Sequence, residues 1–112
     1  MKTASELLTL GEAYEEKGDY LKAQRLYRKA LTIQEKVSGL EDPVLAPFLY
    51  NLGFIQCALD NNADATQLLE RYIAIQQKQL GNEDEDIAEV RQLIASLSSP
   101  LWSSTDPEVS CA

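Results

Sequence analysis

The chain has 112 residues, which is enough for one domain with one modest hydrophobic core. Apolar residues make up 45% of the sequence and charged residues 25%, as is ordinary for a globular protein. The net charge of -8, from 18 acidic and 10 basic side chains, repels phosphate backbones and disfavours a nucleic-acid partner. The chain has no histidine, so it lacks the commonest general base and the commonest metal ligand.

The sequence gives no sign of a membrane or metal partner. No run of about 18 apolar residues occurs, so a membrane-spanning helix is not expected. The first residues, Met1 to Glu6, lack the basic-then-apolar layout of a secretion signal, and the expected location is the cytoplasm. Cys57 and Cys111 belong to no metal or redox spacing and are weak evidence for a disulfide, so Cys57 is expected to be a small buried hydrophobe. No cofactor is predicted.

Apolar residues at helical spacing predict five helices, which we take in chain order. The first runs from about Thr3 to Lys17, and Gly18 can adopt the left-handed conformation that ends it. Asp19 then caps the second helix, which stops near Gly39. The inward stripe of the first helix is Leu7, Leu10, Gly11 and Tyr14, and that of the second is Ala23, Leu26, Tyr27, Ala30, Leu31, Gln34 and Val37.

The third helix is predicted from Pro43 to Leu59, because an Asp-Pro pair is a strong start signal. Pro47 near its first turn is expected to be tolerated there and to be able to tighten or kink the start. This helix is apolar nearly all round, which is typical of a helix with neighbours on both sides. A fourth helix is expected from about Ala63 to Leu80. The fifth follows the acidic run of residues 83–86, where negative charge suits a helix start, and it fades by Ser99.

Parts of the sequence repeat at a fixed distance. The pattern Ile33-Gln34-x-Lys36-x-x-Gly39-x-Glu41-Asp42 returns 42 residues later as Ile75-Gln76-x-Lys78-x-x-Gly81-x-Glu83-Asp84. The same offset pairs Leu10-Gly11 with Leu52-Gly53. A fixed period of this size is typical of a solenoid, in which each unit buries its apolar face against the next. The predicted fold is therefore an all-α solenoid of antiparallel helix pairs, with about two and a half repeats.

The pattern Leu7-x-x-Leu10-Gly11-x-x-Tyr14, followed by Ala23-x-x-x-Tyr27-x-x-Ala30, resembles the tetratricopeptide repeat. The 42-residue period and the Gly-x-x-Asp-Pro joint from Gly39 to Pro43 look like the kinesin light chain subclass. The resemblance implies a repeat domain over residues 1–98, with repeats at about 4–41 and about 46–83 and a capping helix at about 84–98. Residues 99–112 are turn-rich and are predicted to be a flexible tail.

The resemblance also implies a right-handed superhelix whose concave groove binds peptides or protein segments. The family's groove pattern selects seven peptide-binding residues here: Leu8, Glu12, Glu16, Tyr50, Asn51, Phe54 and Gln92. Asn51 matches a recurrent asparagine of the family that bonds an extended peptide backbone, and Tyr50 and Phe54 offer apolar area one turn apart. Because the groove is acidic, it favours a neutral-apolar or basic segment over a C-terminal carboxylate.

These residues also have plainer interpretations. Tyr50 and Phe54 can simply pack between helices. The run of Glu12, Glu15 and Glu16 can be a solvated helix face. The second helix carries Lys22, Arg25, Arg28 and Lys29, mostly on its outer side, which are a weak candidate for a phosphate-binding patch.

The leading hypothesis is a protein–protein interaction adaptor or scaffold without enzymatic activity. Neighbouring carboxylates on exposed helix faces give no support for acid–base catalysis, and no phosphate loop or nucleophile elbow occurs. The alternative is a structural unit that homo-oligomerises through its open solenoid ends, suggested by Leu8 and Leu93 outside the inner stripes. A third possibility is that Leu101 and Trp102 fold back into the groove or onto the fifth helix.

Overall fold

The computed structural model describes residues 3–80 and 84–97. Over these residues every regular element is helical, which confirms the predicted all-α class, and none of the helices is both long and apolar enough to cross a membrane. The elements are α1 (Ala4–Glu16), α2 (Tyr20–Ser38), the 3-10 turn η1 (Pro43–Leu45), α3 (Ala46–Ala58), α4 (Asn62–Leu80) and α5 (Glu85–Leu97). The predicted tail of residues 99–112, with Leu101 and Trp102, lies outside the described residues.

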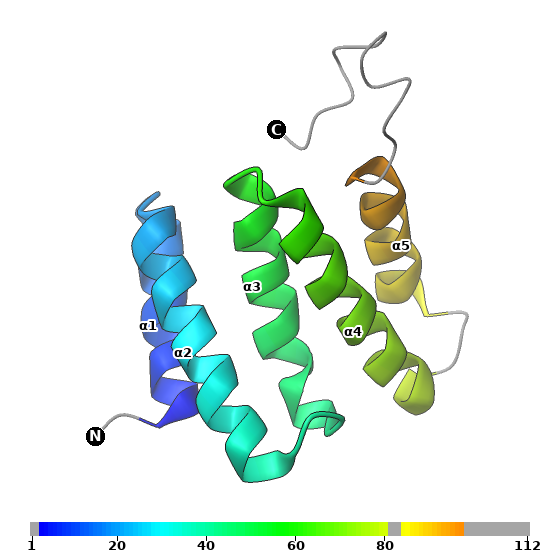
Figure 1. Ribbon diagram of the computed structural model, residues 1–112, viewed down its shortest axis with the longest axis horizontal. Helices are drawn as coiled ribbons and strands as arrows, with labels where there is room; N and C mark the ends of the chain where they lie inside the picture. The colour runs from blue at the N-terminus through cyan, green and yellow to red at the C-terminus, as the bar shows by residue number, and fades with distance from the viewer. Residues whose placement is uncertain (1–2, 81–83, 98–112) are drawn as a thin grey trace, which may run out of the picture.

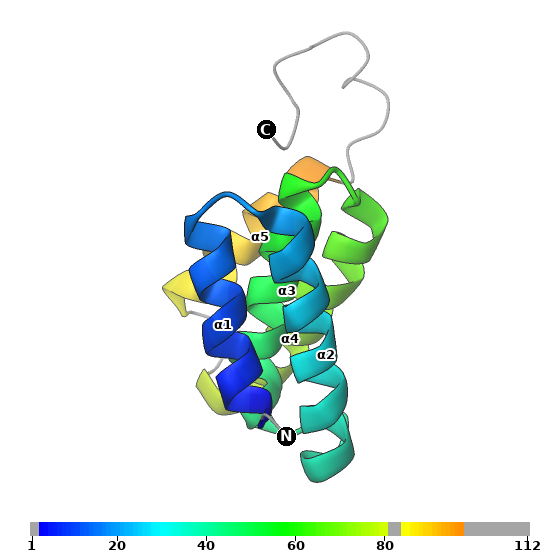
Figure 2. The same ribbon diagram turned by 90° about the vertical axis from the view of Figure 1, so that its left-hand side faces the viewer.

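Four of the helices form two antiparallel hairpins that stand side by side. Figure 1 shows α1 and α2, then α3 and α4, then α5 across the molecule, with α2 in front of α1. In Figure 2, which views the molecule from the α1/α2 side, these two helices run next to each other in opposite directions. The closest packing is within each hairpin, and contacts of α2 with α3 and of α4 with α5 join the units into a solenoid.

The two hairpins cross at equivalent glycines. A Cβ atom added to Gly11 would lie 2.6 Å from Cε1 of Tyr27, and one added to Gly53 would lie 2.7 Å from Cδ2 of Leu69. Gly53 and Leu69 stand 42 residues after Gly11 and Tyr27, so the period of the sequence is also the period of the packing. Only glycine fits at these crossings without displacing the neighbour, because the partner side chain lies directly on the helix backbone.

A single cluster of buried side chains runs through both hairpins and reaches α5. Eight of the 13 residues of α3 are buried, as predicted for a helix with neighbours on both sides. The cluster therefore connects the two hairpins through α3. One member from each helix is Leu7, Tyr27, Leu49, Leu69 and Ile87. The prediction that Val37 lies on the inward stripe of α2 is wrong, because Val37 is 76% exposed in the last turn of a helix that is longer than α1.

Cys57 is buried on α3, with 6% of its surface exposed, which confirms the predicted burial. Its sulfur is also disulfide-bonded. The sequence spacing provides little support for such a bond, because separation along the chain does not determine which cysteines meet in the fold.

Side chains cap the helix starts, at Asp19 as predicted and at Thr3 through a capping box that was not predicted. Thr3 and Glu6 form a capping box at the start of α1, and Asp19 accepts a hydrogen bond from the first turn of α2. Gly18 takes the left-handed conformation, with φ of 83°. Asp60, which stands 42 residues later, adopts the same conformation with φ of 63°, although it carries a side chain.

The third helix begins later in the structure than the sequence predicts, because its first turn is a 3-10 turn. Pro43–Leu45 form a 3-10 turn, and α3 begins at Ala46. Pro47 explains the difference, because it has no N–H to donate to the carbonyl of Pro43 and its ring crowds that carbonyl. The N–H of Ala46 donates to the Pro43 carbonyl instead, which is the tighter spacing of a 3-10 helix. Asp42 caps this turn as expected, accepting from the backbone at 2.8 Å.

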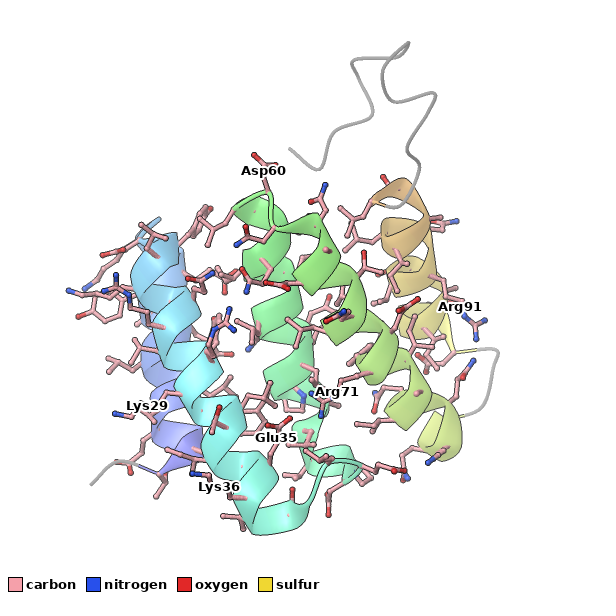
Figure 3. The ribbon with its side chains drawn as sticks, in the orientation of Figure 1. Lys29, Glu35, Lys36, Asp60, Arg71 and Arg91 are labelled. Carbon is pink, nitrogen blue, oxygen red and sulfur yellow. The ribbon has the colours of Figure 1, made fainter. Side chains whose placement is uncertain are left out.

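Polar side chains fix the two hairpins against each other. Nε2 of Gln24 donates to Oε1 of Gln56 at 2.7 Å. Arg71 of α4 reaches toward Glu35 of α2, as Figure 3 shows, and pairs with it at 2.9 Å. Arg71 also donates to the carbonyl of Leu40 at 3.3 Å. Because the Arg71–Glu35 ion pair is partly exposed, it contributes about 1 kcal/mol or less to the free energy of unfolding. It joins α4 of the second hairpin to α2 of the first.

Candidate functional site

The first helices of the two hairpins, α1 and α3, are tied together by a side-chain hydrogen bond. Nδ2 of Asn51 on α3 donates to Oε2 of Glu12 on α1 over 3.3 Å. Both residues belong to the predicted groove set. The structure therefore brings two of its members into contact across the joint between repeats.

A hollow of about 490 Å³ lies beside this bond, and we call it the acidic hollow. It is lined by Glu12, Glu15, Glu16, Tyr20 and Asn51. Three carboxylates around one opening accept hydrogen bonds and favour a cationic group. Within the described ranges no group of three or more histidine, cysteine, aspartate and glutamate side chains is arranged to hold a metal ion.

Glu15 is held in place by a buried tyrosine. The hydroxyl of Tyr27, which is 0% exposed, donates to Oε1 of Glu15 at 2.6 Å. Burial raises the pKa of Tyr27 well above its ordinary value of 10.0, and the bond to Glu15 and the charges of Glu15, Glu12 and Glu16 raise it further. The hydroxyl therefore keeps its proton at neutral pH and remains a donor to the carboxylate.

Two aromatic rings lie one helical turn apart on α3, and we call them the aromatic pair. Tyr50 and Phe54 pack edge to face, with ring centroids 4.6 Å apart. Tyr50 also packs against Tyr72 of α4, at 5.2 Å between centroids. Tyr72 is buried and Tyr50 half-buried, while 37% of Phe54 is exposed. Phe54 thus presents apolar surface to solvent and is supported by the tyrosine rings.

Carboxylates of α5 lie near the aromatic pair. Burial is the largest cause of the raised pKa of Tyr50, and the negative charges of Asp86 and Glu89 raise it further. The pKa of Tyr72 is also raised, again mainly by burial. Acidic side chains of α5 therefore lie near Tyr50, and a separate acidic group, Glu12 of α1, bonds its sequence neighbour Asn51.

The seven predicted groove residues divide into two clusters and two single residues. The acidic hollow brings together Glu12, Glu16 and Asn51, and the aromatic pair consists of Tyr50 and Phe54. Leu8 is half-buried and packs against the core cluster. Gln92 is exposed on α5 and does not line the acidic hollow.

Two residues of the acidic hollow, Glu15 and Tyr20, are absent from the predicted set. The position of Glu15 in the sequence could have identified it. Glu15 lies one helical turn after Gly11, and the ring of Tyr27 crosses α1 at Gly11, so the Tyr27 hydroxyl reaches Glu15. Tyr20 begins α2 after a turn of three residues, and so short a turn returns it beside the last turn of α1.

The sequence model of the Tetratricopeptide repeat family matches residues 3–78. This range covers both helical hairpins except the last two residues of α4, and the hairpin crossings at Gly11 and Gly53 are equivalent. The chain belongs to the tetratricopeptide repeat family. The family is a non-catalytic repeat family, and its repeats generally mediate protein–protein interactions. Searches among curated proteins and among solved structures gave no match.

Proposed function

We propose that this chain is an adaptor that holds a segment of a partner protein against α1 and α3. The observation that carries the proposal is the acidic hollow, which Asn51 of α3 helps to line, with the exposed ring of Phe54 one turn further along the same helix. Apolar anchoring area beside charged groups is what recognition of a short peptide segment requires. The role of the family in protein–protein interaction supports the same function.

The partner segment in this proposal carries a lysine or arginine near an apolar side chain. The cation binds among the carboxylates of the acidic hollow, and the apolar side chain packs on Phe54. The Tyr27 hydroxyl already orders Glu15, so this carboxylate loses little freedom on binding. Asn51 uses Nδ2 to bond Glu12, and its carbonyl oxygen accepts a backbone N–H of an extended segment. The same charges repel a C-terminal carboxylate.

We also propose that the chain is closest to the kinesin light chain-like repeats, because of its 42-residue period. This proposal includes a repeat at about 4–41, a second at about 46–83 and a capping helix at about 84–98. A cytoplasmic location is part of the same proposal.

A peptide array of basic, neutral-apolar and acidic segments tests the adaptor function, followed by fluorescence anisotropy on the best binders. Phe54→Ala removes the exposed anchor, and Glu12→Gln with Glu16→Gln removes two charges while preserving side-chain size. We expect each change to weaken binding of a basic-apolar peptide about tenfold. Salt should weaken the wild-type complex, because exposed charges are screened.

Two matched controls separate the site from general surface effects. Val37→Ala truncates another exposed apolar side chain, 76% exposed on α2, and Glu70→Gln removes an exposed carboxylate on α4. Both should leave affinity within about twofold of wild type. Equal affinity of the wild type, Phe54→Ala and the double charge variant, with helix content unchanged, would rule out this binding face.

Self-assembly through the open ends is the second candidate function. Val37 and Leu40, which are 76% and 63% exposed at and just after the end of α2, offer apolar surface for association, although they lie at the link between the hairpins. Leu8 and Leu93, the leucines that suggest it from the sequence, are half-buried against the core cluster, which weakens it. Sedimentation at rising concentration distinguishes the candidates: an adaptor stays monomeric, whereas self-assembly gives growing mass that Val37→Asp reduces.

A further inference from the structure

Several cationic side chains of the chain are engaged with other groups. Arg71 and Lys78 form ion pairs with Glu35 and Glu41, at 2.9 and 3.0 Å. Lys17 and Lys22 lie over the ring of Tyr14, with their Nζ atoms 5.3 and 5.0 Å from its centroid. These four cations are therefore already in contact with other groups of the chain.

Four other cations stand together on α2, and we call them the basic stripe: Arg25, Arg28, Lys29 and Lys36. All four are exposed, and their spacing places them on one side of the helix. They border a hollow of about 480 Å³ together with Thr32 and Ile33. The ion pairs found between described residues involve none of the four.

The basic stripe lies away from the joint between the hairpins. In Figure 3, Lys29 and Lys36 are on the side of α2 turned away from α3, whereas Glu35 is turned toward Arg71. The opposite side of α2 is buried, through Ala23, Tyr27 and Ala30. One hairpin therefore carries acidic groups on α1 and a separate basic surface on α2.

No ion pair between described residues uses the four cations of the basic stripe to stabilise the fold. Like charges three or four residues apart on a helix repel each other and slightly destabilise it. The sequence has 18 acidic residues, yet Glu35 is the one acid within Tyr20–Ser38, and it is paired with Arg71. The positive charge of the basic stripe is thus uncompensated within α2 and available to an external anion.

We propose that the basic stripe binds an acidic segment of a partner protein, at a surface distinct from the acidic hollow. Arg25 to Lys36 span about 16 Å along the helix axis, which matches three turns of an acidic helix. The two arginines suit carboxylates because a guanidinium binds them with two parallel hydrogen bonds. Ile33, half-buried at the edge of the hollow, meets an apolar side chain of the segment.

The size of the stripe and the charge of the chain favour an acidic segment over a nucleic acid or a lipid surface. The stripe is one helix wide, and the chain as a whole carries a charge of -8. Screening limits the reach of surface charges to about 8–10 Å at physiological salt. A short segment therefore meets mainly the stripe, whereas an extended polyanion also meets the acidic remainder of the molecule.

The test uses the full chain and a labelled helical peptide with glutamates at the spacing of the stripe and one leucine. Its control peptide has glutamine at each glutamate position. Anisotropy is measured with the wild type, with Arg28→Gln/Lys29→Gln, and with the matched double variant Lys78→Gln/Arg91→Gln, which removes the same charge elsewhere. We expect the stripe variant to bind about tenfold more weakly and the matched variant to change affinity less than about twofold. Binding should also weaken from about 0.05 M to about 0.5 M salt.

Four results would overturn the proposal. One is equal affinity for the glutamate and glutamine peptides, and another is equal loss in the two double variants. The third is tighter binding to phosphatidylserine vesicles or to duplex DNA than to the acidic peptide. The fourth is concentration-dependent self-association that Arg28→Gln/Lys29→Gln abolishes, which would make a second copy the occupant. Phe54→Ala should leave acidic-peptide affinity unchanged, so failure of the groove and failure of the stripe are separate outcomes.

Discussion

Gly11 is the residue on which the first hairpin depends most directly. The Cβ of Gly11→Ala would lie 2.6 Å from the rigid ring of Tyr27, so ring or helix must move. We expect a net loss of about 1–3 kcal/mol in the free energy of unfolding, even though alanine is the better helix former. Gly53→Ala should cost less, because the Cδ2 atom of Leu69 ends a flexible side chain. Thermal unfolding followed by circular dichroism measures both, and a stabilised Gly11→Ala variant would contradict the crossing.

Tyr27 should make stability depend on pH in the alkaline range. Its pKa is raised in the folded chain, first by burial and then by Glu15, so the folded state holds a proton that the unfolded tyrosine releases above its ordinary pKa of 10.0. The resulting stability is fully present below pH 10.0 and is lost as pH rises beyond it. Tyr27→Phe removes this dependence and, at neutral pH, costs about 1 kcal/mol for the lost hydroxyl bond.

Urea unfolding of Tyr27→Phe at neutral pH and above pH 10.0 provides the measurement. Tyr50 and Tyr72, whose pKa values are also raised, leave some alkaline dependence in the variant. An equal alkaline decline in wild type and variant would mean that Tyr27 is not the dominant group.

At the scale of elements, the turns inside the two hairpins use the same backbone conformation with different residues. Gly18 has φ of 83° and Asp60 has φ of 63°. A side chain in this region costs about 1–2 kcal/mol, and glycine avoids this strain but loses more freedom on folding. We expect Asp60→Gly to stabilise the protein by about 0.5 kcal/mol and Gly18→Ala to destabilise it by about 1 kcal/mol. Melting temperatures that move in the same direction would contradict a shared turn geometry.

The sequence predicts those features of the elements that depend on local chemistry or on the repeat. The fixed offset of Gly11 and Gly53 identifies the hairpin crossings, and Gly18 marks a helix end through its freedom at positive φ. At Pro43–Leu45 two effects compete: the start signal at Pro43 favours an α-helix, and Pro47 four residues later removes a bond that the helix needs, so the start tightens to a 3-10 turn.

The candidate site is less predictable than the fold. Glu12 and Asn51 come from the family resemblance, and the structure shows them bonded to each other. Leu8 comes from the same resemblance, yet it is half-buried against the core cluster, because neighbours from other helices decide how much of a side chain stays exposed. Tyr20 joins the acidic hollow through the shape of a turn, which spacing along one helix does not encode.

At the scale of the whole molecule, one buried cluster extends from α1 to α5, so we expect both hairpins to unfold together. Leu69→Ala tests this, because Leu69 is 0% exposed and lies on Gly53 in the second hairpin. Its truncation should cost about 2–5 kcal/mol. Native-state hydrogen exchange should then show the same loss of protection for slowly exchanging amides in α1 and α2 as in α3 and α4. Loss confined to α3 and α4 would mean that the hairpins are independent units, joined only by contacts such as Arg71 with Glu35.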